Sequence, residues 1–361
     1  MTTQQAPSMS PEVLWYIPNQ VEPGHRGDDT FTPDHNSLDT LTSHARALEE
    51  HGWQGALIGT GWGRPDTFTV AAALAARTTT FQPLIAIRPG YWQPANFATA
   101  AATLDHLTGG RVRINIVSGT DHLEAYGDAE GAQADRYART REFLQIVRKL
   151  WTEENVTYTG EYYRVKDSTA QPRIVPRAGR PHPKLYFGGA SEAAQRVAAT
   201  EADVQLFWGE PLDGVRERIE KLEALSAELG REHPPLEYGL RITTFVRDTT
   251  DQAWADAEAK VAELAKNRPE QNRSRRTAVG QQRLLELAER GDVLDDNLYT
   301  APGRVGGGGA GTTWLVGSPE DVAESLRKYQ DLGITHFVLS DTPYLREIKR
   351  QGEQLLPLLR G

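Results

Sequence analysis

Two features of the sequence could bind anions. Residues 188–191 read Gly-Gly-Ala-Ser and precede a helical pattern, so Ser191 can cap a helix whose free N–H groups suit a phosphate. The same pattern also occurs at helix starts that bind no ligand. Arg241 lies within an apolar stretch, where a buried guanidinium needs an anionic partner. That partner is either a bound anion or a carboxylate of the protein.

Other apolar stretches also end in polar or aromatic residues. Asn115 and Ser118 close one of them, which indicates a binding loop, although serine and glycine also form ordinary turns. Trp208 closes another and could stack on a planar ring or pack beneath a loop. The remaining histidines, including His182, lack the spacing of a metal site, so we expect no metal.

These residues need a scaffold that brings the ends of several strands together. Eight short apolar stretches recur, each followed by a segment of helical pattern, which predicts a (β/α)8 TIM barrel with insertions after strands 4 and 7. The expected strands are residues 13–18, 54–60, 82–88, 111–119, 184–189, 203–208, 237–246 and 335–341. The expected helices outside the second insertion are residues 37–51, 95–107, 135–151, 191–200, 213–229 and 344–359.

The two insertions interrupt this rhythm. The first contains an alternating segment at 158–167, which predicts a hairpin outside the barrel. The second runs from about residue 247 to 315 and contains helical stretches at 252–267 and 281–290. A glycine-rich tract follows, and we expect a mobile loop near 300–312 that is either a lid over a ligand or a flexible connector. We expect residues 1–361 to form one barrel domain.

Composition narrows the class of protein. The 361 residues carry a net charge of −9 without a basic cluster, so nucleic acid is not an expected partner. The absence of cysteine excludes disulfides and a cysteine nucleophile. The polar amino terminus lacks the pattern of a signal peptide, and no apolar run is long enough to cross a membrane. We therefore expect a cytoplasmic enzyme.

Nine blocks of the sequence, taken in order, resemble the bacterial luciferase-like flavin monooxygenases. Within that family they are most similar to the alkanesulfonate monooxygenase branch. The blocks are residues 14–19, 102–119, 134–143, 180–191, 208–211, 239–249, 280–283, 306–312 and 338–345.

The resemblance implies an enzyme that receives reduced FMN from a separate NAD(P)H-dependent FMN reductase and uses O₂ to convert an alkanesulfonate into an aldehyde and sulfite. The protein would supply orientation and a dry site for the flavin chemistry. We also expect a homo-oligomer, either a dimer or a tetramer. By resemblance, the cofactor-binding residues are Ser118, Tyr137, Gly189, Ala190, Ser191 and Trp208.

The same resemblance assigns substrate-binding and catalytic positions, several of which depart from the alkanesulfonate pattern. A histidine, a cysteine, a second histidine and a tyrosine of that pattern are replaced by Gln20, Arg64, Thr243 and Thr342. The expected substrate-binding residues are Trp15, Gln20, Arg64, Thr243 and Thr342, and the expected catalytic residues are Arg241, Tyr344 and Arg304.

The departures leave the substrate open. A sulfonate, a sulfone, or another carbon or nitrogen compound is compatible with oxygenation. A binding protein or an F420-dependent oxidoreductase on the same barrel is the alternative from another class, because fold does not fix function. Arg64 could either contact an anion at the barrel mouth or lie on the surface.

Overall fold

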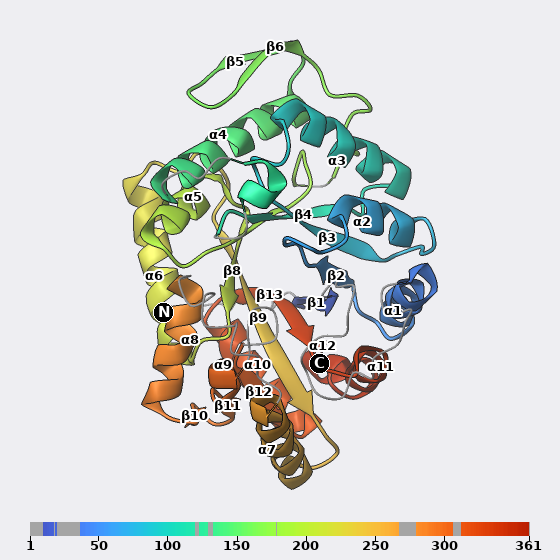
Figure 1. Ribbon diagram of the computed structural model, residues 1–361, viewed down its shortest axis with the longest axis vertical. Helices are drawn as coiled ribbons and strands as arrows, with labels where there is room; N and C mark the ends of the chain where they lie inside the picture. The colour runs from blue at the N-terminus through green and yellow to red at the C-terminus, as the bar shows by residue number, and fades with distance from the viewer. Residues whose placement is uncertain are drawn as a thin grey trace, which may run out of the picture.

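The computed structural model describes residues 10–17, 19, 37–119, 123–128, 133–177, 179–266, 279–305 and 312–360. Eight parallel strands form a closed ring at its centre, in the order β9-β13-β1-β2-β3-β4-β7-β8, and β8 pairs again with β9 (Figure 1). The fold is a (β/α)8 TIM barrel, and all eight predicted strands are confirmed. The strands are β1 Glu12–Ile17, β2 Gly55–Ile58, β3 Gln82–Ile87, β4 Arg113–Val117, β7 Leu185–Gly188, β8 Val204–Trp208, β9 Glu237–Val246 and β13 Ile334–Ser340.

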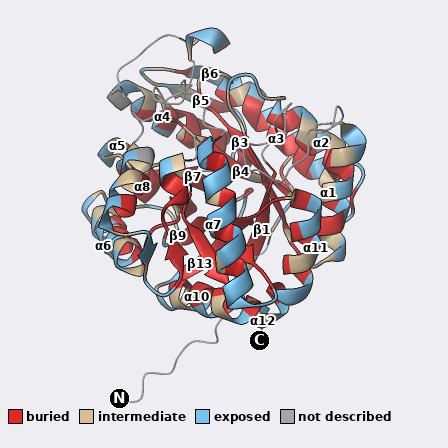
Figure 2. Cartoon of the chain, turned by 60° about the horizontal axis from the view of Figure 1, so that its bottom comes forward, coloured by how far each residue is buried: buried red, intermediate tan, exposed pale blue. Residues whose placement is uncertain are grey.

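Helices surround the ring, with buried inner faces and exposed outer faces (Figure 2). Their ends follow local chemistry: the Ser37 hydroxyl accepts a hydrogen bond from the Thr40 amide at 3.1 Å, and Gly109 ends α3 with a φ of 66°. None of the described helices is long and apolar enough to cross a membrane. The helices are α1 Leu38–Glu50, α2 Thr67–Ala75, α3 Pro94–Thr108, η1 Glu124–Tyr126, α4 Gln133–Thr152, α5 Glu192–Glu201, α6 Leu212–Glu228, α10 Pro319–Asp331, α11 Tyr344–Gln354 and α12 Leu356–Arg360.

The helical pattern differs from the prediction in three places. Helices α2 and α10 were not expected. The single helix expected over 344–359 is divided into α11 and α12 near Leu355. Pro357 explains the division, because it has no N–H to donate to the preceding turn.

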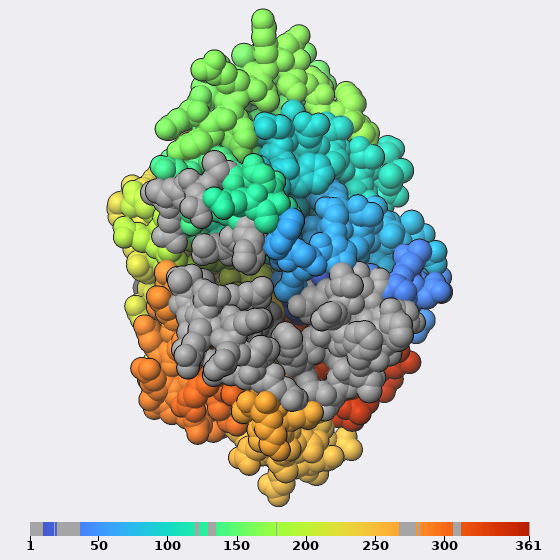
Figure 3. Space-filling view, in the orientation of Figure 1, coloured from blue at the N-terminus to red at the C-terminus, as the bar shows by residue number. Residues whose placement is uncertain are grey.

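Both predicted insertions are present. Strands β5 Val156–Thr159 and β6 Arg164–Ser168 form an antiparallel hairpin outside the barrel, as expected. This hairpin and the second insertion lie at opposite ends of the long axis (Figure 3). The second insertion consists of α7 Thr250–Lys266, α8 Val279–Arg290, β10 Val293–Leu294, β11 Leu298–Tyr299, α9 Pro302–Val305 and β12 Trp314–Gly317.

Strand β12 was not predicted, and the length of β9 explains it. The first half of β9 pairs with β8, whereas residues 243–246 pair in parallel with β12. Trp314 of β12 stacks on Phe245 of β9 with ring centroids 5.4 Å apart, so this extension has a small core of its own. Residues 306–311 of the expected mobile loop lie outside the described residues, and the lid remains a prediction.

Alternation along each strand separates two compartments. On β1, Leu14 and Tyr16 face the barrel interior, whereas Val13, Trp15 and Ile17 pack against the surrounding helices. The inward residues of neighbouring strands form an apolar layer across the middle of the barrel. The layer consists of Leu14, Leu57, Leu84, Ala86, Tyr186, Val204, Leu206 and Val338.

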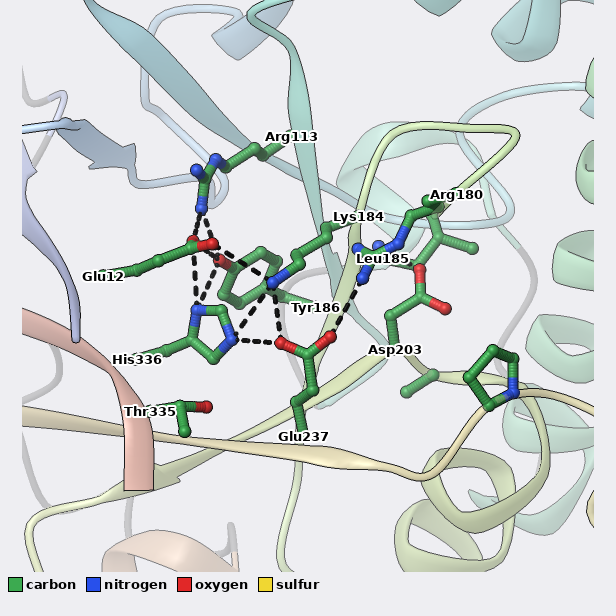
Figure 4. A network of polar contacts seen from close by, with 12 residues as sticks. Glu12, Arg113, Arg180, Lys184, Leu185, Tyr186, Asp203, Glu237, Thr335 and His336 are labelled. Atoms are coloured by element: carbon green, nitrogen blue, oxygen red, sulfur yellow. Dashed lines mark hydrogen bonds and ion pairs between the residues drawn. The ribbon is translucent and has the colours of Figure 1, made fainter. Parts of the chain in front are cut away.

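A charged network crosses the barrel below this layer, where the strands begin (Figure 4). Glu237 accepts hydrogen bonds from Lys184 Nζ and pairs with His336 Nε2, both at 2.6 Å. On the other side of His336, Nδ1 lies 3.0 Å from the Tyr186 hydroxyl, and Glu12 pairs with both His336 and Arg113. The network therefore joins strands β1, β4, β7, β9 and β13 by charge.

The network lowers the pKa of its carboxylates. Burial alone would raise the pKa of Glu237, but hydrogen bonds from His336 and Lys184 outweigh it and lower that pKa to about 2. Burial opposes ionisation of Glu12 too, yet the bond to His336 and the charge of Arg113 hold its pKa far below the usual range. A carboxyl group with a lowered folded-state pKa contributes stability above its unfolded pKa and loses it as the pH falls toward the folded value.

We therefore expect acid to destabilise the barrel partly through Glu237, as its carboxylate is protonated between about pH 4.5 and 2. Glu237→Gln should be less stable at pH 7, and its free energy of unfolding should fall less steeply from pH 5 to 3. At pH 7 the free energy of unfolding of the variant should be lower than that of the parent by about 1 to 2 kcal/mol. This value allows for solvent screening, because the carboxylate is partly exposed. Urea unfolding at several pH values measures this, with exposed Glu50→Gln as the control. An unchanged acid dependence in Glu237→Gln would contradict the role of this network.

Candidate active site

A cavity of about 290 Å³ lies at the carboxyl ends of the barrel strands. Seven barrel strands or the loops after them contribute to its wall, together with α4, α6 and the insertion helix α8. Barrel enzymes build their sites at this end. The cavity contains seven of the residues expected from the sequence, namely Arg64, Tyr137, Gly189, Ala190, Ser191, Trp208 and Arg241.

Backbone geometry at residues 188–191 forms a cradle on one wall. Gly189 has a φ of 154°, and a side chain there would meet the Ala194 methyl group at 2.6 Å. Ser191 caps α5, with its hydroxyl accepting from the Ala194 amide at 3.3 Å. The carbonyl groups of the cradle are held from behind, because Gln205 donates to Gly189 at 3.2 Å and Gln195 donates to Ala190 at 2.9 Å. This arrangement suits an anion at the amino-terminal end of α5.

Two arginines meet at Tyr16 on the cavity floor. The Arg241 guanidinium lies over the Tyr16 ring, with Cζ 4.1 Å from the centroid. Arg64 donates to the Tyr16 hydroxyl at 3.4 Å. Of the two positions considered for Arg64, the structure therefore supports the cavity rather than the outer surface. Tyr16 was not singled out from the sequence, although it lies inside the first matching block.

Asn115 presents a buried carboxamide to the same space. Its Oδ1 atom has no hydrogen-bond partner among the described residues. Leaving such an oxygen unsatisfied costs about 1 to 3 kcal/mol, so a ligand that donates to it would recover that energy. The carboxamide and the cradle together fit a ligand that has polar edges and an anionic end.

Glu210 joins two further arginines at the cavity wall. Its carboxylate accepts from Arg218 at 2.7 Å and from Arg283 at 3.0 and 2.7 Å. Hydrogen bonding to Glu210 raises the pKa of Arg283, whereas burial lowers the pKa of Arg218. Sequence reasoning did not identify these residues as part of the site, although Glu210 and Arg283 lie in two of the matching blocks.

The sequence matches the model of the luciferase-like monooxygenase family over residues 12–336. The chain belongs to this family. Its fold and the cavity at the strand ends agree with that membership.

Three solved structures share the barrel. A riboflavin lyase with modified FMN and substrate riboflavin is 20% identical over 98% of this chain and 92% of its own, with a TM-score of 0.75. EDTA monooxygenase from Chelativorans sp. BNC1 is 18% identical over 97% of this chain and 93% of its own, with a TM-score of 0.75. An F420-dependent secondary alcohol dehydrogenase is 17% identical over 98% and 100%, with a TM-score of 0.68. At these identities the likeness establishes the fold alone.

Four of the expected site residues do not line the cavity of this luciferase-like barrel. Trp15 is fully buried on the outer side of β1 and packs edge-on against Trp53, with ring centroids 4.8 Å apart. Strand alternation explains this correction, because Tyr16 takes the inward position. Arg304 pairs with Asp292 on the insertion, away from the cavity. Ser118 lies beside the cavity, with Oγ 2.8 Å from Thr140 Oγ1, and Tyr344 is buried at the start of α11.

The two threonines that replace family residues are also set back from the cavity. Thr243 of β9 does not line the cavity, and its Oγ1 lies 3.4 Å from Ser340 Oγ. Thr342 accepts hydrogen bonds from Lys260 of α7 at 2.6 and 3.0 Å, so it joins the insertion to the loop after β13. Gln20 lies outside the described residues.

The cradle generates a prediction about Gly189. Gly189→Ala should displace the first turn of α5, because the new methyl group meets Ala194, and should lower the free energy of unfolding by about 1 to 3 kcal/mol. Denaturant unfolding measures this. Gly188→Ala is the matched control, since a methyl group there meets no atom within 4 Å. Equal stability of the two variants would contradict the close approach at Gly189.

Proposed function

We propose that this protein is an FMNH₂-dependent two-component monooxygenase that oxygenates an organosulfur compound, with alkanesulfonate desulfonation as the leading reaction. One observation carries the proposal: a phosphate-type cradle at residues 188–191 and the Arg241–Tyr16 pair share a single cavity. A ligand that spans them would have an anionic end in the cradle and a second anion beside Arg241.

FMN fits the donors and acceptors of the cavity. The backbone of Gly189 and Ala190, the Ser191 hydroxyl and the Tyr137 hydroxyl would hold the phosphate. The Asn115 carboxamide and Trp208 would contact the ring system. Reduced FMN, when bound, would supply the O₂-dependent redox chemistry of the reaction.

The protein's own residues would orient the substrate and keep water away. Arg241 would hold the sulfonate by charge-assisted hydrogen bonds, and Arg64 would add a second positive charge at the Tyr16 hydroxyl. Leu57, Ala86 and Leu206 line the floor with apolar side chains, which favours exclusion of water from the reacting atoms.

The proposed reaction balances as an alkanesulfonate, O₂ and FMNH₂ giving an aldehyde, sulfite, FMN and water. A separate NAD(P)H-dependent FMN reductase would be the partner that supplies FMNH₂. The replacement of family residues by Arg64, Thr243 and Thr342 keeps a sulfone or another carbon or nitrogen compound as the alternative substrate.

Anaerobic titration with reduced FMN, followed by tryptophan fluorescence, is the first test. We expect reduced FMN to bind more tightly than reduced F420, because the cradle suits a terminal phosphate, and more tightly than oxidised FMN, because the proposed reaction uses the reduced flavin. In the presence of a flavin reductase, sulfite release then tests sulfonates and sulfinate release tests sulfones. A preference for F420 would refute the monooxygenase proposal, whereas FMNH₂ binding with release of neither sulfite nor sulfinate would refute only the organosulfur substrate.

Arg241 gives a sharper test of the substrate site. Arg241→Ala should lower kcat/KM for a sulfonate at least about 30-fold, equivalent to about 2 kcal/mol of transition-state stabilisation. Arg241→Lys should retain part of the activity, because lysine keeps the charge but loses the planar fork. Sulfite release measures both, with exposed Arg327→Ala as the control. Activity of Arg241→Ala within a few fold of the parent would remove Arg241 from the proposed site.

A further inference from the structure

We propose that Arg283 of the insertion helix α8 is a phosphate-binding residue that selects phosphorylated over unphosphorylated flavin, with Glu210 and Arg218 holding it in place. The inference rests on the flavin binding proposed above and adds a specificity determinant from outside the barrel strands. The inference requires three features. Hydrogen bonds must connect Arg283 with the cradle, the side chains around Arg283 must carry a net positive charge, and the Arg283 guanidinium must face the cavity.

Hydrogen bonds through Glu210 and Arg218 connect Arg283 with the cradle. Arg283 donates Nε and one terminal nitrogen to the two oxygens of Glu210, at 3.0 and 2.7 Å. Arg218 donates one terminal nitrogen to the same carboxylate at 2.7 Å and the other to the Gly189 carbonyl at 3.3 Å. Arg283 is therefore linked to the cradle through one carboxylate and one guanidinium.

Arg218 is fixed in this position by burial. Its guanidinium lies over the Phe207 ring, with Cζ 4.5 Å from the centroid. The side chain is only 7% exposed, whereas that of Arg283 is 36% exposed. Arg218 is thus a positioning residue, and Arg283 is the one whose outer edge can reach a ligand.

The charges of the cluster do not cancel. Two guanidinium groups share the single Glu210 carboxylate, so these three side chains carry one net positive charge. The amino-terminal end of α5 adds about half a positive charge on the same wall. A phosphate monoester carries about −1.5 to −2 at neutral pH and matches this combination, whereas the terminal hydroxyl of an unphosphorylated flavin does not.

Arg283 lies on the face of helix α8 that borders the cavity. Val279, Gly280 and Leu284 line the same cavity from the same face of the helix. Gly280 lies close to Trp208, since a Cβ atom at this glycine would be 3.7 Å from the indole ring. Helix α8 of the insertion therefore packs against the mouth of the barrel, which places Arg283 at the edge of the cavity.

The test compares reduced FMN with reduced riboflavin in anaerobic fluorescence titrations of the full-length protein. For the parent we expect much tighter binding of reduced FMN. Arg283→Met should weaken reduced FMN binding about 10- to 100-fold, the effect of losing a charge-assisted hydrogen bond, and should change riboflavin binding by less than about threefold. The affinity of Arg283→Lys for reduced FMN should lie between those of the parent and of Arg283→Met, because lysine keeps the charge but loses the planar fork of the guanidinium.

Arg290→Met is the matched control. Arg290 lies on the same helix and forms a similar ion pair, with Asp213 at 3.0 Å, but it does not line the cavity. Its substitution should leave both affinities unchanged. An equal loss of FMN affinity in Arg290→Met and Arg283→Met would overturn the inference, because the effect would then come from the helix as a whole.

The two flavins separate this inference from the proposed function. A parent protein that binds reduced riboflavin as tightly as reduced FMN would overturn phosphate selection and leave flavin binding intact. An Arg283→Met variant that weakens both flavins equally would do the same. A parent protein that binds neither flavin would refute the proposed function itself.

Discussion

Closure of the barrel is the constraint on which the rest of the structure depends. Once β8 pairs with β9, every strand must send alternate side chains into the interior, and those side chains fall into layers. The lowest layer is the charged network around Glu237 and His336, and the middle layer is apolar. The cavity lies above these layers, at the carboxyl ends of the strands, and Leu57, Ala86 and Leu206 of the middle layer form part of its floor.

Positive charge is concentrated around that cavity. Four arginines line the cavity, and Glu210 is the one carboxylate among its lining residues. Glu210 pairs with Arg218 and Arg283 at the wall, while Arg241 and Arg64 meet at Tyr16 on the floor. Under the proposed function, the first group would lie near the phosphate of reduced FMN and the second near the sulfonate of the substrate.

The family match and the residues that depart from the alkanesulfonate pattern lie largely in different parts of the molecule. The match to luciferase-like monooxygenases runs through the barrel strands and the helices between them. Of the replaced residues, Arg64 and Thr342 lie in the loops after β2 and β13, where a loop can change without disturbing the ring, whereas Thr243 lies within β9. Thr342, for example, is bonded to Lys260 of the insertion, so one of these replacements now connects the barrel to α7.

The sequence by itself determined the eight strands, both insertions and the position of the 188–191 cradle, because these depend on local periodicity and on the glycines of one short segment. It did not determine which face of a strand a residue occupies: Trp15 was expected at the site, yet Tyr16 points inward, since strand register decides the face. The sequence also did not predict the Glu210 cluster or strand β12. Both join segments more than 60 residues apart, and only the tertiary structure brings such segments into contact.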